Sequence, residues 1–407
     1  MSPLAASSWQ LLAFRSVRIA HLADIHLGFR QYHRLTPNGI NQREADVANA
    51  FRSIIDQVIE ARPDAVLVAG DLFHAVRPTN AAIIFAFRQF QRLREALPEV
   101  PVVVIAGNHD TPRSSETGSI LRLYEELGVD VALDEPRRLA WPNLGLSVLA
   151  VPHSALRSAE RPALHPDGAE KHQILLLHGE IEGVYPAEIS GATWGGVVVP
   201  RETLHAKEWS WVALGHYHVQ HEVEPGVWYA GAVEYSTSNP WGERRDEERH
   251  GRTGKAWLLL DLEKRTTKAM PIPAARRVID LAPLYGDGRD AAQLSRDIAE
   301  RLDGIKGGWN DQIVRQVVFN VPRDVARGID HAAVRAVKAE ALHFHLDLRR
   351  PAAAGRLGLD SAGRRKPLNE VLRDYLAARP LPAELDRDEF VKAGVDLLDA
   401  VVREDEA

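Results

Sequence analysis

The segment DAVLVAGDLFH, residues 64–74, joins an apolar run to a polar turn. Asp64 to Ala69 has the continuous apolar character of a strand that is buried between layers of helices. Gly70 and Asp71 follow at once, so a carboxylate stands just past the end of this predicted strand. The segment therefore predicts an α/β domain in which functional groups gather at the carboxyl ends of strands.

The same pattern occurs before and after this segment. A strand is predicted from Val17 to Ala23, followed by Asp24-Ile25-His26. Another is predicted from Val100 to Ala106, followed by Gly107-Asn108-His109-Asp110. Amphipathic helices are expected between and after these strands. They cover residues Glu44–Ala61, Asn80–Ala96 and Ser115–Leu127.

The following part of the chain is rich in predicted strands. The expected strands are Leu146–Val151, Gln173–Leu177, Trp211–Leu214, Val227–Ala230 and Ala256–Leu262. Two more polar motifs come directly after strands here, His178-Gly179-Glu180 and Gly215-His216-Tyr217-His218. Two sheets packed as a sandwich and flanked by helices would account for this order of elements.

A segment with two prolines near Met270 predicts a domain boundary, and a small α+β unit is expected after it. Two amphipathic helices, Leu368–Ala378 and Arg387–Val402, are expected near the end. The predicted divisions are a leader at 1–16, the main domain at 17–272, the α+β unit at 273–348, a basic linker at 349–366 and a helical segment at 367–407.

Composition excludes several kinds of chemistry. The 407 residues include no cysteine, which rules out disulfides, thiolate zinc sites and cysteine nucleophiles and fits a reducing cytoplasm. No apolar run is long enough to cross a bilayer, so no membrane association is expected. The formal net charge is -6, so any binding of nucleic acid must depend on local basic patches and bound cations.

The five polar motifs together indicate a centre for two metal ions. Taken singly, most of these motifs are better explained as a turn, a loop or a surface histidine. Together they supply carboxylates, an amide oxygen and imidazoles, which are the ligands of hard and borderline cations. Two cations about 3.5–4 Å apart activate an attacking oxygen and neutralise charge in phosphodiester hydrolysis, and one carboxylate must bridge them.

The motif series resembles the calcineurin-like metallophosphoesterase superfamily and, within it, the Mre11/SbcD-type nucleases. The resemblance depends on HLADIHLG at 21–28, AGDLFH at 69–74 with Arg77-Pro78, and GNHD at 107–110. It covers residues 17 to about 235 and becomes a match in the order of elements beyond Met270. It implies an α/β fold, a four-layer α/β/β/α sandwich with a smaller α+β capping domain and a C-terminal helical pair.

The resemblance also implies roles for single residues. The first metal would be held by Asp24, His26, Asp71 and His218. The second would be held by Asp71, Asn108, His178 and His216. Two Mn²⁺ ions are expected, with Mg²⁺ and Fe left open. His109 is the expected catalytic residue that binds no metal, and Asp110 is expected to orient it. For His74, contact with a substrate phosphate and pairing with backbone at a helix start are equally favoured.

Partners are expected from the same resemblance. The helix from Asn80 and the one after it would form a homodimer through Ile83 and Leu121. The alternative, which the resemblance disfavours, is that these faces only cover the sheet. The C-terminal helices would bind a Rad50/SbcC-like coiled-coil ATPase. Glu234 to Gly254 is long and rich in both signs of charge, and a mobile loop is expected there.

The expected function is that of a Mn²⁺-dependent DNA exonuclease and endonuclease subunit in DNA end processing and repair. The alternative is a small-nucleotide phosphodiesterase or phosphomonoesterase of the same superfamily. The expected location is cytoplasmic, and nucleoid-associated if the source is bacterial.

Overall fold

The computed structural model describes residues 16–112, 118–184, 196–351, 368–379, 381 and 386–405. The chain forms two compact units. The first comprises Met1–Leu281, Arg301–Gln316 and His331–His345, and the second Ala282–Glu300, Val317–Asp330 and Leu346–Ala407. The predicted leader, apart from Ser16, and residues 352–366 of the predicted linker lie outside the described residues. The predicted domain boundaries stay predictions.

Two six-stranded sheets form the framework of the first unit. The order in one is β14-β13-β1-β2-β3-β4 and in the other β11-β12-β10-β7-β6-β5. The first sheet comprises β14 (Thr266–Pro271), β13 (Ala256–Asp261), β1 (Arg18–Leu22), β2 (Ala65–Val68), β3 (Val102–Ile105) and β4 (Asp130–Ala132). The second comprises β11 (His221–Glu224), β12 (Val227–Tyr229), β10 (Trp211–Gly215), β7 (His172–His178), β6 (Leu146–Val151) and β5 (Arg137–Trp141).

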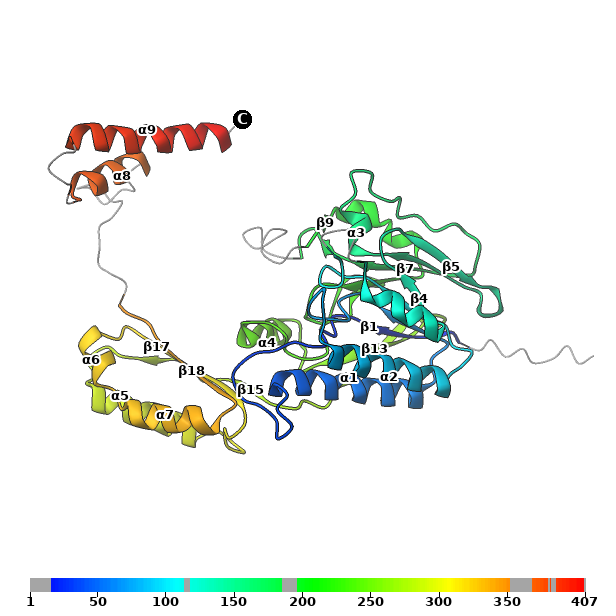
Figure 1. Ribbon diagram of the computed structural model, residues 1–407, viewed down its shortest axis with the longest axis horizontal. Helices are drawn as coiled ribbons and strands as arrows, with labels where there is room; N and C mark the ends of the chain where they lie inside the picture. Colours follow the sequence, from blue (N-terminus) through cyan, green and yellow to red (C-terminus); the bar gives the residue numbers. More distant parts are fainter. Residues whose placement is uncertain are drawn as a thin grey trace, which may run out of the picture. The chain divides into compact units, whose positions relative to one another are not determined.

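The two sheets pack face to face. Ile19 and Val103 of the first sheet share one buried apolar cluster with Leu176 and Ala213 of the second. Helices α1 (Gln42–Ala61) and α2 (Asn80–Ala96) cover the outer face of the first sheet, as Figure 1 shows. Helix α3 (His153–Leu156) and short 3₁₀ turns lie on the outer face of the second. The predicted four-layer sandwich is confirmed.

Local sequence explains why the two long helices begin where they do. The Asn41 side chain accepts the backbone N–H of Arg43 before α1, and Thr79 accepts that of Ala82 before α2. Such side chains satisfy donors that have no partner inside the first helical turn. Apolar residues of α1 recur at helical spacing and are all buried against the first sheet. They are Val47, Phe51, Ile54, Ile55 and Val58.

Two expectations for the first unit are wrong. The predicted mobile loop contains helix α4 (Pro240–Arg249), which begins at a capping side chain from Asn239 and has Pro at its first position. Its Trp241 and Glu247 side chains are buried, so tertiary contacts hold the charged sequence in place. The helix predicted from Ser115 is a 3₁₀ helix, η1 (Ile120–Leu127), and residues 113–117 lie outside the described residues.

Leu121 is wrong as a dimer contact, because its side chain is fully buried in the cluster beneath α1 and α2. Leu121 and Tyr124, three residues apart, are the buried residues of η1. Ile83 packs partly against the same cluster. The apolar side chains that are exposed nearby are Ile84, at 50%, and Leu123, at 37%. Homodimer formation through Ile83 stays a proposal.

The remaining elements are a mixture of strands and helices followed by the two predicted C-terminal helices. In the first unit β15 (Val278–Asp280) runs parallel to the start of β17 (Ile313–Phe319), and in the second β16 (Leu284–Tyr285) runs parallel to its end. The other elements are α5 (Ala291–Asp303), α6 (Arg323–Gly328), α7 (His331–Glu340), β18 (His343–Leu348), α8 (Leu368–Ala377) and α9 (Arg387–Asp405). Among the described helices, none has the length and apolar character that a membrane span requires.

Replacing Phe51 by Ala is expected to lower the free energy of unfolding of the first unit by about 3–5 kcal/mol. Phe51 is fully buried beside Phe90, with ring centroids 5.9 Å apart, so truncation leaves a cavity in the layer between helix and sheet. Urea denaturation followed by circular dichroism measures the change. Glu60→Ala, at an exposed position of the same helix, serves as the control, and equal effects of the two variants would contradict this account.

Candidate metal centre

The predicted ligands lie where the strands of both sheets end. Asp24, Asp71 and Asn108 follow β1, β2 and β3, which run parallel to one another. His178 is the last residue of β7, and His216 follows the parallel strand β10. Because parallel strands present their carboxyl ends at one edge, polar groups from both sheets meet there.

The backbone at these positions is unusual. Four of the predicted ligands have a positive φ although none is glycine, namely Asp24 at 50°, His26 at 54°, Asp71 at 52° and His216 at 104°. L residues adopt this region rarely and at a cost, and such residues cluster at functional sites. The surrounding hydrogen bonds fix the turns. The Asp24 amide donates to the carbonyl of Gly70, and the His26 amide to that of Asp71.

One group of donors lies around His26. Ligand atoms of Asp24, His26 and His218 all lie within 4.8 Å of one another. The Nε2 atoms of His26 and His218 are 3.0 Å apart. Two ligands at about 2.1 Å from a cation and at right angles to each other are about 3 Å apart. This separation therefore suits two imidazoles that share one cation.

A second group lies around His178. Ligand atoms of Asp24, Asp71 and His178 also lie within 4.8 Å of one another. The amide oxygen of Asn108 is 2.9 Å from His178 Nε2 and 3.1 Å from His216 Nδ1. These separations again match neighbouring ligands of one cation.

Asp71 lies between the two groups. Its Oδ2 is 3.8 Å from Nε2 of His26 and 3.5 Å from Nε2 of His178. Its Oδ1 accepts the backbone N–H of His109 at 2.9 Å, which fixes the orientation of the carboxylate. Gly107 is required beside it, because a Cβ at that position would lie 2.1 Å from Oδ1. The residues present fit a pair of divalent cations with one bridging carboxylate.

The protonation of the histidines follows from burial and charge. Burial lowers the pKa of His216 to about 3 and that of His26 well below its usual value, so both rings are neutral and able to bind metal. Burial would also lower the pKa of His178, but the Asp71 carboxylate raises it to about 9. Nδ1 of His178 faces the carbonyl of Ala69 at 2.7 Å and directs Nε2 toward the site.

The two carboxyl groups of the centre differ. Burial would raise the pKa of Asp71, but His178 holds it well below its usual value. Burial raises the pKa of Asp24 to about 6, against the opposing effect of His178. Both Asp24 oxygens accept the backbone N–H of His216 at 3.1 Å. A cation beside these groups would replace protons as the source of positive charge.

His109 and Asp110 have other partners than the sequence predicts. Nδ1 of His109 faces the carbonyl oxygen of His74 at 2.7 Å. The Asp110 carboxylate instead accepts backbone N–H groups of Leu72, Phe73 and Gly107 at 3.0–3.1 Å. These three bonds tie the turn after β2 to the turn after β3. Burial, followed by the Asp71 charge, raises the pKa of Asp110 to about 7.

His74 lies beside the centre. Its ring stacks on that of His109 with centroids 5.2 Å apart, and His26, His74 and His109 form a further group of three imidazoles. The His74 amide donates to the carbonyl of Leu27, so backbone pairing is present, although the residue lies in a bend and not at a helix start. The structure therefore brings all the predicted site residues into one region.

One buried carboxylate behind His218 is not predictable from the sequence motifs. Glu243 Oε2 lies 3.8 Å from His218 Nδ1 and accepts a hydrogen bond from Thr237 at 3.1 Å. Its other oxygen pairs with the Lys255 ammonium. Burial would raise the pKa of Glu243, but Lys255 lowers it to about 2, so a carboxylate faces the histidine. Only the helical fold of α4 brings Glu243 to this position.

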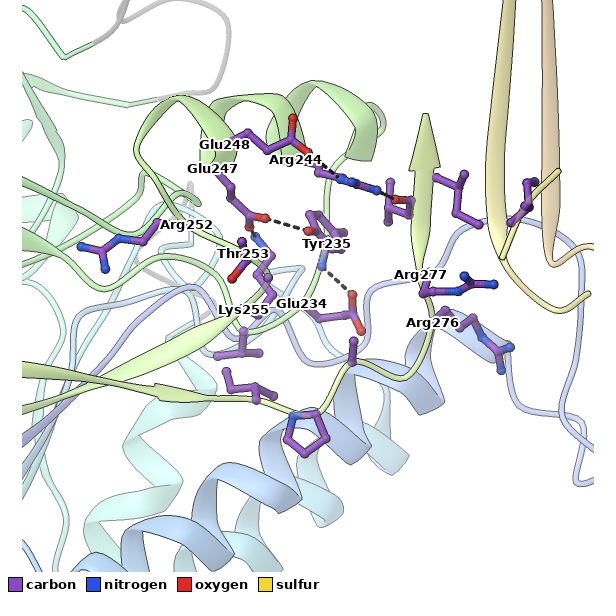
Figure 2. Close-up of a pocket in the computed structure, with 18 of the residues that line it drawn as sticks. Glu234, Tyr235, Arg244, Glu247, Glu248, Arg252, Thr253, Lys255, Arg276 and Arg277 are labelled. Carbon is purple, nitrogen blue, oxygen red and sulfur yellow. Dashed lines mark hydrogen bonds and ion pairs between the residues drawn. The ribbon is translucent and has the colours of Figure 1, made fainter. Parts of the chain in front are cut away.

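Further contacts fix the lysine. Figure 2 shows Glu247 reaching both Lys255 and the Tyr235 hydroxyl. The Lys255 Nζ lies 2.7 Å from Glu247 Oε1 and 4.5 Å from the centre of the Tyr235 ring, and Tyr235 donates to Glu247 at 2.7 Å. Such pairing is needed to keep three charges buried.

A cavity of about 340 Å³ opens in front of the centre. His26, Asn108, His109 and His218 line one part of it, and the segment from Ser236 to Asn239 lines another. The cavity gives a substrate access to the carboxylate and imidazole groups.

Comparison with known proteins agrees with this geometry. Residues 17–238 match the family model described as calcineurin-like phosphoesterase. The chain is 31% identical to the DNA double-strand break repair protein Mre11 of Sulfurisphaera tokodaii over 60% of this chain and 59% of that protein. It is 29% identical to Mre11 of Saccharolobus solfataricus, over 61% of each chain. Mre11 of Methanosarcina acetivorans is 28% identical over 72% of this chain and 44% of its own.

The chain thus spans 44–61% of the length of these curated relatives. The crystal structure of TT1561 of Thermus thermophilus overlaps 63% of this chain and 100% of its own at 13% identity and a TM-score of 0.35, too distant a likeness to bear on the fold. The family model covers more than half of the chain and every strand end that forms the centre. The chain belongs to the calcineurin-like phosphoesterase family.

Proposed function

We propose that this protein is a DNA nuclease that hydrolyses phosphodiester bonds with two divalent cations. The observation that carries the proposal is the position of the Asp71 Oδ2 atom, which lies within 4 Å of imidazoles from both sheets. One carboxylate shared between two donor groups is what two close cations require. A centre for a single ion would not need donors on both sides.

The ligands divide into two sets that share Asp71. Asp24, His26, Asp71 and His218 would hold the first ion. Asp71, Asn108, His178 and His216 would hold the second. When bound, the pair supplies an activated water and neutralises charge on the phosphoryl oxygens. Oxygen and imidazole donors suit Mn²⁺, with Mg²⁺ and Fe as alternatives.

His109 is proposed as the proton donor to the leaving oxygen. Its Nδ1 is occupied by the His74 carbonyl, which leaves Nε2 as the nitrogen that can face a substrate. The stacked ring of His74 lies beside it and is proposed to contact a substrate phosphate. Asp110 serves catalysis indirectly, because it holds the turn from which His109 projects.

DNA is favoured as the substrate by the names of the relatives, each described as a DNA double-strand break repair protein. The net charge of -6 opposes attraction of DNA by the whole molecule. Affinity for DNA must then come from the cations and from local basic groups, so metal-free protein should bind DNA weakly. A small-nucleotide phosphodiesterase or phosphomonoesterase is the second candidate, since the same centre would serve it.

A coiled-coil ATPase of the Rad50/SbcC kind is proposed as partner of the C-terminal helices. Helices α8 and α9 pack on each other, with Gly394 beside Leu376. Tyr375 and Leu397 nevertheless stay 45% and 69% exposed. Apolar side chains on an otherwise charged helix pair favour a protein partner.

The His109→Ala protein is expected to cleave DNA about 10²–10⁴-fold more slowly while binding Mn²⁺ as the wild type does. The loss follows because the substitution removes a proton donor and no ligand. End-labelled duplex and single-stranded DNA, p-nitrophenyl phosphate and cyclic nucleotides are incubated with protein and Mn²⁺. Cleavage of the small substrates alone would overturn the nuclease proposal and favour the second candidate.

Glu243→Gln is expected to weaken Mn²⁺ binding about 10- to 100-fold, because a neutral side chain no longer orients and polarises His218. Electron paramagnetic resonance of free Mn²⁺ during a titration measures the affinity without any substrate. Glu248→Gln is the matched control, since Glu248 lies on the same helix, is exposed and pairs with Arg244. Equal affinities in the two variants would refute a role for Glu243 in metal binding.

Deleting residues 367–407 is expected to abolish association with the ATPase while DNA cleavage in Mn²⁺ is retained, because the metal centre lies within residues 24–218. Co-purification and analytical ultracentrifugation measure association. Leu397→Glu is expected to weaken association as well, by placing a charge on the apolar contact. Lys392→Glu, an exposed position of the same helix, is the control. Unchanged association of the deleted protein would contradict the partner proposal.

A further inference from the structure

Three metal-binding side chains gather outside the candidate metal centre. His165 lies in the segment between α3 and β7. His205 lies between two 3₁₀ turns, η3 (Arg201–Leu204) and η4 (Ala206–Glu208). Glu208 is the last residue of η4. The three residues precede the amino ends of β7 and β10, whereas His178 and His216 of the candidate metal centre lie at the carboxyl ends of the same two strands.

The three side chains face one another. Nδ1 of His165 is 3.4 Å from Oε2 of Glu208, and Nδ1 of His205 is 3.5 Å from Oε1 of the same carboxylate. The two imidazole rings lie with centroids 3.8 Å apart. One ligand atom of each residue lies within 4.8 Å of those of the other two.

The two nitrogen-to-oxygen distances are close to those between ligands of a tetrahedral ion. Ligands at about 2.1 Å from zinc and at tetrahedral angles are about 3.4 Å apart. Both nitrogen-to-oxygen separations, 3.4 and 3.5 Å, are close to that value, although each involves a different oxygen of Glu208. The ring centroids, 3.8 Å apart, lie closer than the roughly 5 Å expected for two imidazoles on one tetrahedral ion, so the rings must swing apart when an ion binds.

The backbone beneath the cluster is held firmly. Leu164 and Leu204 directly precede the two histidines, and Trp209 directly follows Glu208. All three are buried in the apolar cluster on the outer face of the second sheet. Trp209 donates its ring N–H to the carbonyl of Leu204 at 3.0 Å, and the Glu208 amide donates to that of His205 at 2.8 Å. The backbone that carries the three ligands is therefore fixed before any ion arrives, which lowers the cost of binding.

We infer that His165, His205 and Glu208 form a zinc site that is separate from the candidate metal centre. Two imidazoles and a carboxylate are a donor set of zinc, and the fourth position would be open to water. The candidate metal centre is richer in hard oxygen ligands and suits Mn²⁺, so the two sites should select different ions. The site goes beyond the proposed function and does not depend on it.

The charges nearby permit a cation. Arg138 approaches the backbone carbonyl of His165, but its guanidinium is 3.7 Å from the Asp167 carboxylate, which balances its charge. Lys207, between the two ligands of the turns, is exposed. The histidine and glutamate side chains are themselves 35–51% exposed, so an ion can enter without any opening of the fold.

A bound ion would connect two segments that are otherwise far apart along the chain. His165 belongs to the stretch that leads into β7, and His205 and Glu208 to the turns that lead into β10. A single ion would link the segment that precedes β7 to the turns that precede β10 and restrict the motion of both.

Co²⁺ is the probe, because tetrahedral Co²⁺ absorbs visible light far more strongly than six-coordinate Co²⁺. Full-length protein is titrated with Co²⁺, and Zn²⁺ is then added. The wild type should show the absorption band of tetrahedral Co²⁺ and lose this band when Zn²⁺ is added. In equilibrium dialysis the wild type should bind one equivalent of Zn²⁺ per chain more than the His205→Ala and Glu208→Gln proteins. DNA cleavage in Mn²⁺ should be equal in all three proteins.

Glu202→Gln is the matched control, because Glu202 is an exposed glutamate of η3 that is not among the three ligands. The Glu202→Gln protein should show the tetrahedral Co²⁺ band and bind as much Zn²⁺ per chain as the wild type. The inference is overturned if the His205→Ala and Glu208→Gln proteins bind as much zinc as the wild type, or if Glu202→Gln loses the band to the same extent. Thermal unfolding without metal shows whether the variants remain folded.

Discussion

The carboxylate of Asp71 lies buried between imidazoles that come from two different sheets, and this position constrains the structure around it. A buried anion is tolerated only with compensating charge and hydrogen bonds. Here the His109 amide binds one oxygen, while the rings of His26 and His178 face the other. The two sheets must therefore end at the same place, and the apolar contacts between them bring those ends together.

Strain at the strand ends follows from the same constraint. Asp24, His26 and Asp71 all have a left-handed backbone, which costs free energy that the sandwich must supply. The carboxylate of Asp110 offsets part of that cost, because it binds three amides across the turns after β2 and β3. Placing Asp110 in this framework removes it from contact with His109, so the rigidity of the centre and the orientation of its proposed acid come from different groups.

Sequence alone could predict the sandwich and the ligands because both depend on local patterns. Each ligand lies at or within a few residues of the end of an apolar strand, and parallel strands gather such residues at one edge. The contact of Glu243 with His218 could not be predicted from the sequence. Glu243 comes close to His218 and Lys255 only because a charged segment folds as the helix α4. Leu121 was expected at a dimer contact from the resemblance alone, and the sequence could not show that packing against the residues of α1 and α2 buries it.

The two clusters of histidines differ in what metal binding would do for them. In the candidate metal centre the ligands are buried, and His178 Nε2 lies 3.5 Å from the Asp71 carboxylate, so an ion that binds there takes the place of a partner already present. At His165 and His205 the rings are exposed to water, and little desolvation opposes either the empty or the filled state. Occupancy of the proposed zinc site should therefore follow zinc supply closely, whereas occupancy of the candidate metal centre depends on how well each ion balances the buried charges.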